Sequence, residues 1–162
     1  MNPSFAEIID LTLSLREKYY PEAKVSVLSN ATLIGRDAVF DALKKIDNPI
    51  MKIDDFSDVL VQKMNKPVVV YHIDEVVKNL ERFDGDFILQ TMFLKSNDFN
   101  ATTPEALDGW MNIVRRLRPR EIMVYTIDRE TPDKTLAKYT VEEMTALVQP
   151  LLEEGYNIQI RG

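Results

Sequence analysis

The segment Phe87-Ile88-Leu89-Gln90-Thr91-Met92-Phe93-Leu94 decides the fold. Apolar residues occur at both odd and even positions of this segment, so both faces of the strand that it would form favour burial. Strands that are apolar on both faces are typical of parallel sheets covered on both sides. The segment therefore predicts a strand of a parallel α/β sheet.

Further strand and helix patterns alternate along the chain on either side of this strand. Alternation of this kind predicts a parallel sheet with right-handed crossovers, and the last three strands begin about 35 residues apart, a spacing that suits barrel βα units. The expected class is α/β with a parallel sheet, and the spacing suits a (β/α) TIM-like barrel. Strands are expected over 24–29, 49–53, 87–94, 121–127 and 156–160, helices over 4–19, 36–46, 73–83, 103–117 and 140–154, and an irregular or partly helical connection over 54–67.

Two S/T-x-x-E patterns mark expected helix starts. Ser4 with Glu7, and Thr140 with Glu143, match the capping box, in which each side chain bonds the backbone N–H of the other. Thr103-Pro104 is a third start signal, because proline is favoured in the first helical turn.

Composition indicates one ordinary globular domain over 1–162. Of the 162 residues 45% are hydrophobic and 28% charged, and the net charge is −6. No apolar run approaches the roughly 18 residues of a membrane span, and no signal segment is evident, so a cytoplasmic location without membrane contact is expected. The negative charge argues against a broad nucleic-acid surface. Four arginines between 115 and 120 are explained by the negative dipole end of the expected helix.

The chain contains no cysteine and one histidine, His72. This excludes disulfides, a cysteine nucleophile, cysteine-ligated zinc and any iron–sulfur cluster held by the chain itself. It also excludes every two-histidine metal motif. We expect a surface or capping role for His72.

Polar residues follow the expected strands at Ser29-Asn30, Asp54-Asp55, 95–98 and Asp128-Arg129. In parallel α/β folds, ligands bind at the carboxyl ends of the strands. Each of these residues taken singly is explained by a helix cap or a turn, but as a set on one rim they favour a binding site. A magnesium site at Asp54-Asp55 is disfavoured because no third acid is well placed.

Five segments, in order along nearly the whole chain, resemble the radical S-adenosylmethionine superfamily. The branch that they resemble most is that of the iron–sulfur oxidoreductases related to the wyosine-synthesis enzymes of tRNA modification. The segments are Val27–Leu33 (family Ser/Thr-Asn-Gly-Thr/Ser-Leu), Met51–Asp54 (Lys/Ser-Leu-Asp), Met64–Pro67 (Ile-Asn-Arg-Pro), Gln90–Lys95 (the fifth barrel strand) and Tyr125–Pro132 (Tyr-Thr-Ile-Asp-Arg-Pro-Thr-Pro).

The chain departs from the family in ways that matter. Ala31 replaces a glycine and Glu130 a proline. The family's amino-terminal Cys-x3-Cys-x2-Cys loop and its Gly-Glu-Pro motif are both missing. The resemblance therefore implies a partial (β/α) TIM-like barrel, the carboxyl-terminal part of a barrel that lacks its first strands. It predicts that an edge strand and an apolar inner face are exposed, and that the chain self-associates or is only modestly stable. A monodisperse, highly stable monomer in light scattering would contradict that expectation.

The resemblance implies which residues would contact S-adenosylmethionine. Ser29 and Asn30 would lie near its methionine part, and Lys52 and Asp54 near its ribose or carboxylate. Gln90, Met92 and Tyr125 would face the cofactor or the substrate. An alternative reading places Met92 and Met123 in the core, and Trp110 is expected to pack against the outer layer of the sheet.

The resemblance implies a portion of a radical enzyme that is catalytically silent alone. The intact family uses S-adenosylmethionine and a 4Fe–4S cluster, and we expect neither to be bound to this chain. The same resemblance implies that the substrate of the intact enzyme is a tRNA, a peptide or a protein. Two alternatives stay open: a non-catalytic α/β module that binds a nucleotide or a protein, and a small hydrolase or isomerase using Asp54 and Asp128, which no nucleophile elbow or P-loop supports.

Overall fold

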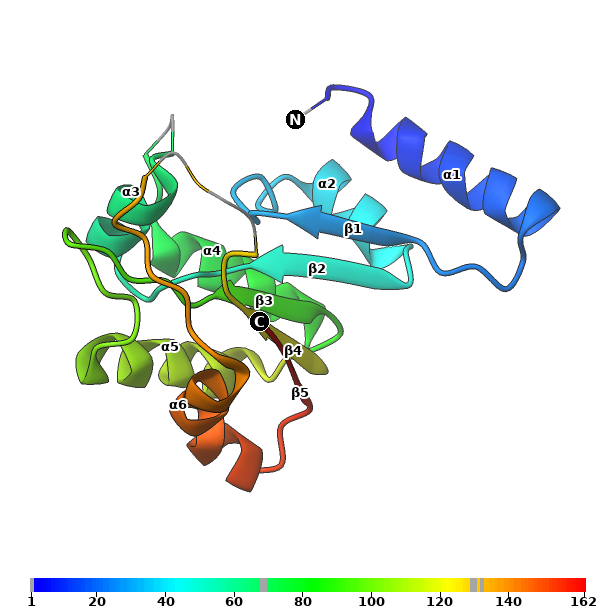
Figure 1. Ribbon diagram of the computed structural model, residues 1–162. Helices are drawn as coiled ribbons and strands as arrows, with labels where there is room; N and C mark the ends of the chain where they lie inside the picture. Colours follow the sequence, from blue (N-terminus) through cyan, green and yellow to red (C-terminus); the bar gives the residue numbers. More distant parts are fainter. Residues whose placement is uncertain (1, 68–69, 129–130, 132) are drawn as a thin grey trace.

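A computed structural model describes residues 2–67, 70–128, 131 and 133–162. Its centre is a five-stranded sheet in which every neighbouring pair is parallel and the strand order follows the chain (Figure 1). The expected α/β class with a parallel sheet is confirmed. The strands are β1 (Ser26–Ser29), β2 (Asn48–Lys52), β3 (Ile88–Met92), β4 (Glu121–Tyr125) and β5 (Ile158–Arg161).

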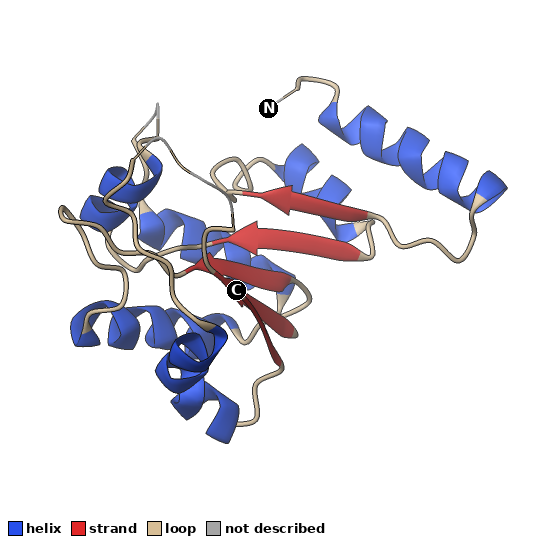
Figure 2. Cartoon of the chain, viewed as in Figure 1, coloured by secondary structure: helices blue, strands red, loops and turns tan. Residues whose placement is uncertain are grey.

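Helices connect successive strands, as right-handed parallel crossovers require. Figure 2 shows α3 beyond the carboxyl ends of the strands, and α1 beside the β1 edge. The helices are α1 (Phe5–Tyr19), α2 (Asp37–Lys44), α3 (Asp58–Asn65), α4 (Ile73–Leu80), α5 (Pro104–Leu117) and α6 (Val141–Glu153), with a 3-10 turn η1 (Glu81–Phe83) after α4.

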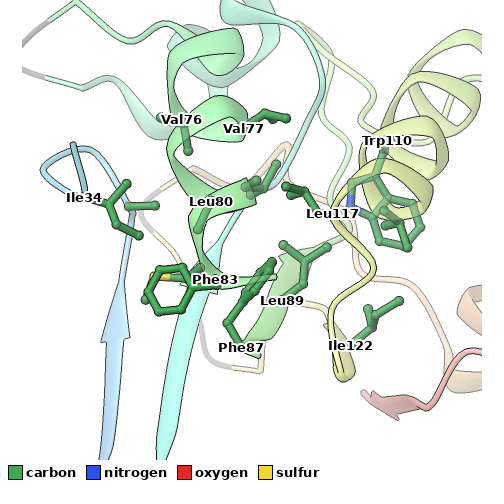
Figure 3. Packing of buried hydrophobic residues seen from close by; sticks show 14 of the residues in the cluster. Ile34, Val76, Val77, Leu80, Phe83, Phe87, Leu89, Trp110, Leu117 and Ile122 are labelled. Atoms are coloured by element: carbon green, nitrogen blue, oxygen red, sulfur yellow. The ribbon is translucent and has the colours of Figure 1, made fainter. Parts of the chain in front are cut away.

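One face of the sheet packs against helices and forms the core. Met51, Leu89 and Ile122 are fully buried on this face, and they meet apolar residues of α2, α4, α5 and α6. Figure 3 shows part of this cluster around Leu80 and Phe83. Burial of this apolar surface is the main force that holds the helical layer on the sheet.

The opposite face carries the side chains that alternate with these core residues. The strand register aligns them in rows across the sheet, because partners in adjacent parallel strands point the same way. One row runs Lys52–Gln90–Met123–Gln159, and the next runs Met92–Tyr125–Arg161. These side chains are half-buried or exposed, so this second face, called the open face below, is available to a ligand.

The edge of the sheet at β1 is unpaired among the described residues, and α1 lies beyond it, next to α2. Ile9 of α1 is buried. Exposed apolar side chains recur along the same helix at Ile8, Leu11 and Leu15. Among the described residues, no helix combines the length and apolar character that crossing a membrane requires.

Of the two predicted capping boxes, one is confirmed and one is wrong. The Thr140–Glu143 capping box is present in both directions, but the Ser4–Glu7 box is wrong. Ser4 has φ −89° and ψ 24° and makes no side-chain cap bond; an N-cap residue usually has extended backbone angles, and Ser4 N–H instead donates to Asn2 Oδ1 at 2.9 Å. The connection 54–67 contains a full helix, α3, and the strand expected over 87–94 is confined to Ile88–Met92.

Candidate binding site on the open face and strand rim

All five strands end at the same rim, so the loops that follow them bring distant parts of the chain together. Asn30 follows β1, Asp54 follows β2, and Asp128 follows β4. Two pockets lie in this region. The smaller, of about 200 Å³, lies over β1, β2 and α3. The larger, of about 460 Å³, lies over β3, β4 and β5.

Asp54 is the structural centre of the rim. Its side chain is 1% exposed, and its Oδ2 pairs with Lys52 Nζ. The same Oδ2 accepts from Asn65 Nδ2 at 2.8 Å, and Oδ1 accepts from the backbone N–H of Met92 at 3.0 Å. A buried carboxylate is tolerated when it is paired and hydrogen-bonded in this way. Asp54 therefore joins β2, β3 and α3, and its lone pairs are largely used within the protein.

Lys52 is the cation that this network presents to the smaller pocket. Its side chain is 21% exposed, and it shares the pocket with Asn30, Asn65 and Tyr71. Burial, and secondarily the charges of Asp54 and Asp58, raise the pKa of Tyr71 well above its usual value. Tyr71 is thus a neutral hydrogen-bonding group, and Lys52 provides the positive charge of the pocket.

Gln90 and Tyr125 line the larger pocket on the open face. The Oε1 atom of Gln90 is buried and has no hydrogen-bond partner among the described residues. A buried carbonyl without a partner is costly, so a turn of the half-buried Gln90 side chain toward the pocket would let a ligand donor satisfy this oxygen. Burial, aided by the charge of Asp54, raises the pKa of Tyr125 to about 12, so its phenol stays protonated.

Ser29 occupies a different position from the other predicted site residues. It is the register partner of the buried Met51, so its side chain lies on the helix-facing side of the sheet. Its Oγ accepts from the N–H of Ala31 at 3.1 Å, as a serine does in a turn. Ala31, where the family has glycine, has φ 60° and is buried. The chain thus keeps a left-handed turn here despite the strain of a Cβ.

The structure brings six of the seven predicted residues to the open face and the strand rim, with Asp54 buried beneath the rim. Asn30 and Lys52 line the smaller pocket beside Asp54. Gln90, Met92 and Tyr125 lie on the open face. Met92 and Met123 are half-buried there, so the interpretation of both as core residues is wrong. Whether these residues bind a cofactor remains a prediction.

Sequence reasoning missed Asn65, Tyr71, Gln159 and Arg161. Asn65 lies within the Met64–Pro67 segment quoted above, so that motif was the available signal for its place at the rim. Tyr71, Gln159 and Arg161 carry no motif. The end of the Tyr125–Pro132 segment, including Arg129, Glu130 and Pro132, lies outside the described residues.

His72 has the surface and helix-start position expected for it. Its backbone is the N-cap of α4, and its Nδ1 lies 3.2 Å from Asp58 Oδ2. The described residues contain no group of three or more metal-binding side chains.

Asp55 is a second buried carboxyl, 1% exposed. Its Oδ1 accepts from Ser57 N–H at 3.0 Å, whereas its Oδ2 has no partner among the described residues. Burial raises the pKa of Asp55 from 3.8 to about 6. Because the folded-state pKa is the higher one, the folded protein holds this proton more tightly, and the free energy of unfolding falls as pH rises from 3.8 through about 6.

We therefore expect Asp55→Asn to raise the free energy of unfolding by about 2 kcal/mol at about pH 8, because asparagine carries no charge to desolvate. At about pH 4 the two proteins should be nearly equally stable, because Asp55 is then protonated in the folded state. Urea denaturation at both pH values measures the difference. An equal effect at the two pH values would show that ionisation of Asp55 is not its cause.

Comparison with known proteins agrees with this architecture. No family model matches the chain. The UPF0026 protein MJ1312 of Methanocaldococcus jannaschii is 20% identical over 128 residues, which cover 76% of this chain and 39% of that protein. The chain thus spans about two-fifths of the length of this curated relative.

Solved structures share the fold at low sequence identity. A domain of pyruvate-formate lyase-activating enzyme from Bacteroides vulgatus superposes with a TM-score of 0.66 at 12% identity, covering 100% of this chain and 96% of that domain. A radical SAM methyltransferase from Sphaerobacter thermophilus gives 0.64 at 16%, covering 84% and 39%. Streptococcus suis SuiB, bound to S-adenosylmethionine, gives 0.65 at 15%, covering 96% and 34%.

These likenesses define the class of fold: a parallel α/β partial barrel of the kind found in radical SAM enzymes. Two of these solved proteins are much longer than this chain.

Proposed function

We propose that this chain is the carboxyl-terminal part of the catalytic barrel of a radical SAM iron–sulfur oxidoreductase. We further propose that its open face and rim form part of the S-adenosylmethionine site of the intact enzyme, with only weak residual affinity when the cluster-bearing strands are missing. The observation that carries this is the placement of Lys52, Gln90, Met92 and Tyr125 along one face of a parallel sheet, at the carboxyl ends of the strands. That rim is where parallel α/β folds bind ligands.

The residues present fit the organic cofactor. The ammonium of Lys52 suits the methionine carboxylate, because charge-assisted pairs of this kind are strong. Tyr125 and Met92 offer an aromatic face and a polarisable thioether for adenine. The Oε1 atom of Gln90, which has no partner among the described residues, would accept from an amino group once the side chain turns toward the pocket. Since the oxygens of Asp54 are occupied, its role is to hold Lys52 rather than to accept the ribose hydroxyls.

The residues present do not fit a 4Fe–4S cluster. The chain contains no cysteine to ligate iron. We therefore derive no radical step for this chain, and we propose that it is catalytically silent by itself. In the intact family the cluster-bearing strands precede this part of the barrel.

The free edge of β1 supports this arrangement. Leu28 on that strand is 59% exposed, and an unpaired parallel edge strand is a template for another strand. We propose that this edge pairs with cluster-bearing strands in the intact enzyme, and that it drives self-association when they are missing.

The branch and the substrate also belong to the proposal. The segments quoted above favour the wyosine-related oxidoreductases, which modify tRNA. A SuiB structure, bound to the precursor peptide SuiA, has the same fold with a TM-score of 0.68, which supports a peptide as a second substrate class. A cytoplasmic location is proposed with them.

Titration of the ¹⁵N-labelled chain with S-adenosylmethionine tests the proposal. We expect weak but saturable shifts in the amide signals of Asn30, Lys52, Gln90, Met92 and Tyr125. 5′-Methylthioadenosine lacks the amino acid part, so it should bind about tenfold more weakly if Lys52 pairs with the carboxylate. Equal affinity for the two would remove Lys52 from the site.

A pair of tyrosine variants tests the adenine contact in the same titration. Tyr125→Ala should weaken binding about tenfold, because base–aromatic stacking contributes about 1–3 kcal/mol. Tyr20→Ala is the matched control, because Tyr20 is 73% exposed and lies on the loop after α1. Saturable binding that Tyr125→Ala leaves unchanged would favour the alternative, a module that binds nucleotides or proteins elsewhere.

A further inference from the structure

Three polar side chains at the β5 end of the larger pocket have no side-chain partner among the described residues. Asp128, Gln159 and Arg161 line this pocket. In the part of the chain that the structure describes, none of the three takes part in a side-chain hydrogen bond or an ion pair. No ion pair within 4.0 Å joins Arg161 to Asp128.

Two arginines of α5 have ion-pair partners. Arg115 pairs with Glu154 at 2.6 Å, and Arg116 pairs with Glu81 at 2.6 Å. These pairs join neighbouring helices and helix ends. The guanidinium of Arg161 thus lies on the binding face of the sheet without the partner that most other described arginines have.

The register places Arg161 within reach of the open face. It is the partner of Tyr125, and Gln159 is the partner of Met123. The apolar lining of the same pocket includes Ile50 and Met123. An apolar floor strengthens a charged contact above it, because it lowers the local dielectric constant.

Arginine presents a planar fork of N–H donors that matches a carboxylate. The amide of Gln159 adds a donor beside it, and the exposed carboxylate of Asp128 accepts from N–H groups. Asp128 also repels a second negative charge, which disfavours a polyphosphate backbone. The overall charge of −6 acts in the same direction.

We propose that this end of the pocket binds the substrate through a carboxylate, held by Arg161 and Gln159, with an N–H donor of the same ligand directed to Asp128. This is the pattern of an amino acid or of an acidic peptide, so of the two substrate classes proposed above it favours the peptide over tRNA. The inference rests on the proposed function, because it assigns the substrate to the β5 side and the cofactor to the β2–β4 side of one open face.

The test is a titration of the ¹⁵N-labelled chain with paired probes. N-Acetylglycine carries a carboxylate next to an N–H, and N-acetylglycinamide is its uncharged match. Acetyl-Gly-Asp-Gly-amide and its Asn analogue separate an internal acidic side chain from a free carboxyl end. A uridine oligonucleotide represents RNA.

We expect the carboxylate probes to shift the signals of Gln159 and Arg161, and the amide analogues to bind about tenfold more weakly. Tighter binding of N-acetylglycine than of the tripeptide indicates an amino acid or a chain terminus, and the reverse indicates an acidic peptide. Arg161→Gln should abolish the difference in affinity between each carboxylate probe and its amide analogue. Arg36→Gln is the control, because Arg36 is exposed and lies on the helical side of the molecule before α2.

Equal binding of carboxylates and amides would overturn the inference, as would a carboxylate preference that survives Arg161→Gln. Tighter, Arg161-dependent binding of the oligonucleotide would overturn it in favour of RNA. The S-adenosylmethionine titration is read at the amide signals of Lys52 and Tyr125, and the carboxylate titration at those of Gln159 and Arg161. Either titration can therefore fail while the other succeeds, so the cofactor proposal and the substrate proposal are tested separately.

Discussion

Trp110→Ala should lower the free energy of unfolding by about 4 kcal/mol, the loss typical of deleting a buried indole. Trp110 is 1% exposed and packs edge-on against Phe93, with ring centroids 5.3 Å apart. Its Nε1 donates to Thr91 Oγ1 at 2.9 Å, and that hydroxyl donates to the backbone oxygen of Ile53 at 2.6 Å. The side chain therefore joins α5 to the ends of β3 and β2.

Urea denaturation measures this loss, and two variants separate its causes. Trp110→Phe keeps most of the ring packing but removes the N–H donor, so about 1–2 kcal/mol should be lost. Val59→Ala is a control at a side chain that is 64% exposed and should change stability by no more than about 0.5 kcal/mol. A loss below about 1 kcal/mol for Trp110→Ala would mean that the α5 packing is wrong.

Asp54→Ala should lower the free energy of unfolding by about 3 kcal/mol, because it leaves Lys52 half-buried without its counter-ion. The backbone N–H of Met92 and the amide of Asn65 also lose their acceptor. The rim should loosen as a result, with the largest changes in hydrogen exchange in α3 and at the end of β3.

The control for Asp54 is an ion pair on the surface. Asp10 pairs with Lys45 at 2.7 Å with both side chains about half exposed, so Asp10→Ala should cost at most about 1 kcal/mol. Lys52→Met in the Asp54→Ala background should recover part of the lost stability, because it removes the unpaired charge. Equal losses for Asp54→Ala and Asp10→Ala would contradict the central place given to Asp54.

The order of elements was predictable from the sequence because it depends on local patterns. The apolar segment around Leu89 and the capping box at Thr140 each contain their own signal. The burial of Trp110 followed from its position on an amphipathic helix. The capping box predicted at Ser4 is wrong because the S-x-x-E pattern alone does not fix the backbone angles of the N-cap residue.

The site was predictable only in outline. Parallel topology brings the strand ends together, so Lys52, Gln90 and Tyr125 share a face once the register is known. The Asp54 network joins residues 11 and 38 positions away in the chain, and no local pattern encodes such contacts. Ser29 lies on the helix-facing side and not at the predicted site, because a shift of one residue in register moves a side chain to the other side of the sheet.

The cofactor position is measured most directly by intermolecular nuclear Overhauser effects between S-adenosylmethionine and the ¹³C-labelled chain. We predict contacts from the adenine protons to the Met92 methyl group and the Tyr125 ring, and from the methionine part to the Lys52 side chain. Contacts confined to the helical side of the sheet, or the absence of any contact at saturating ligand, would contradict it.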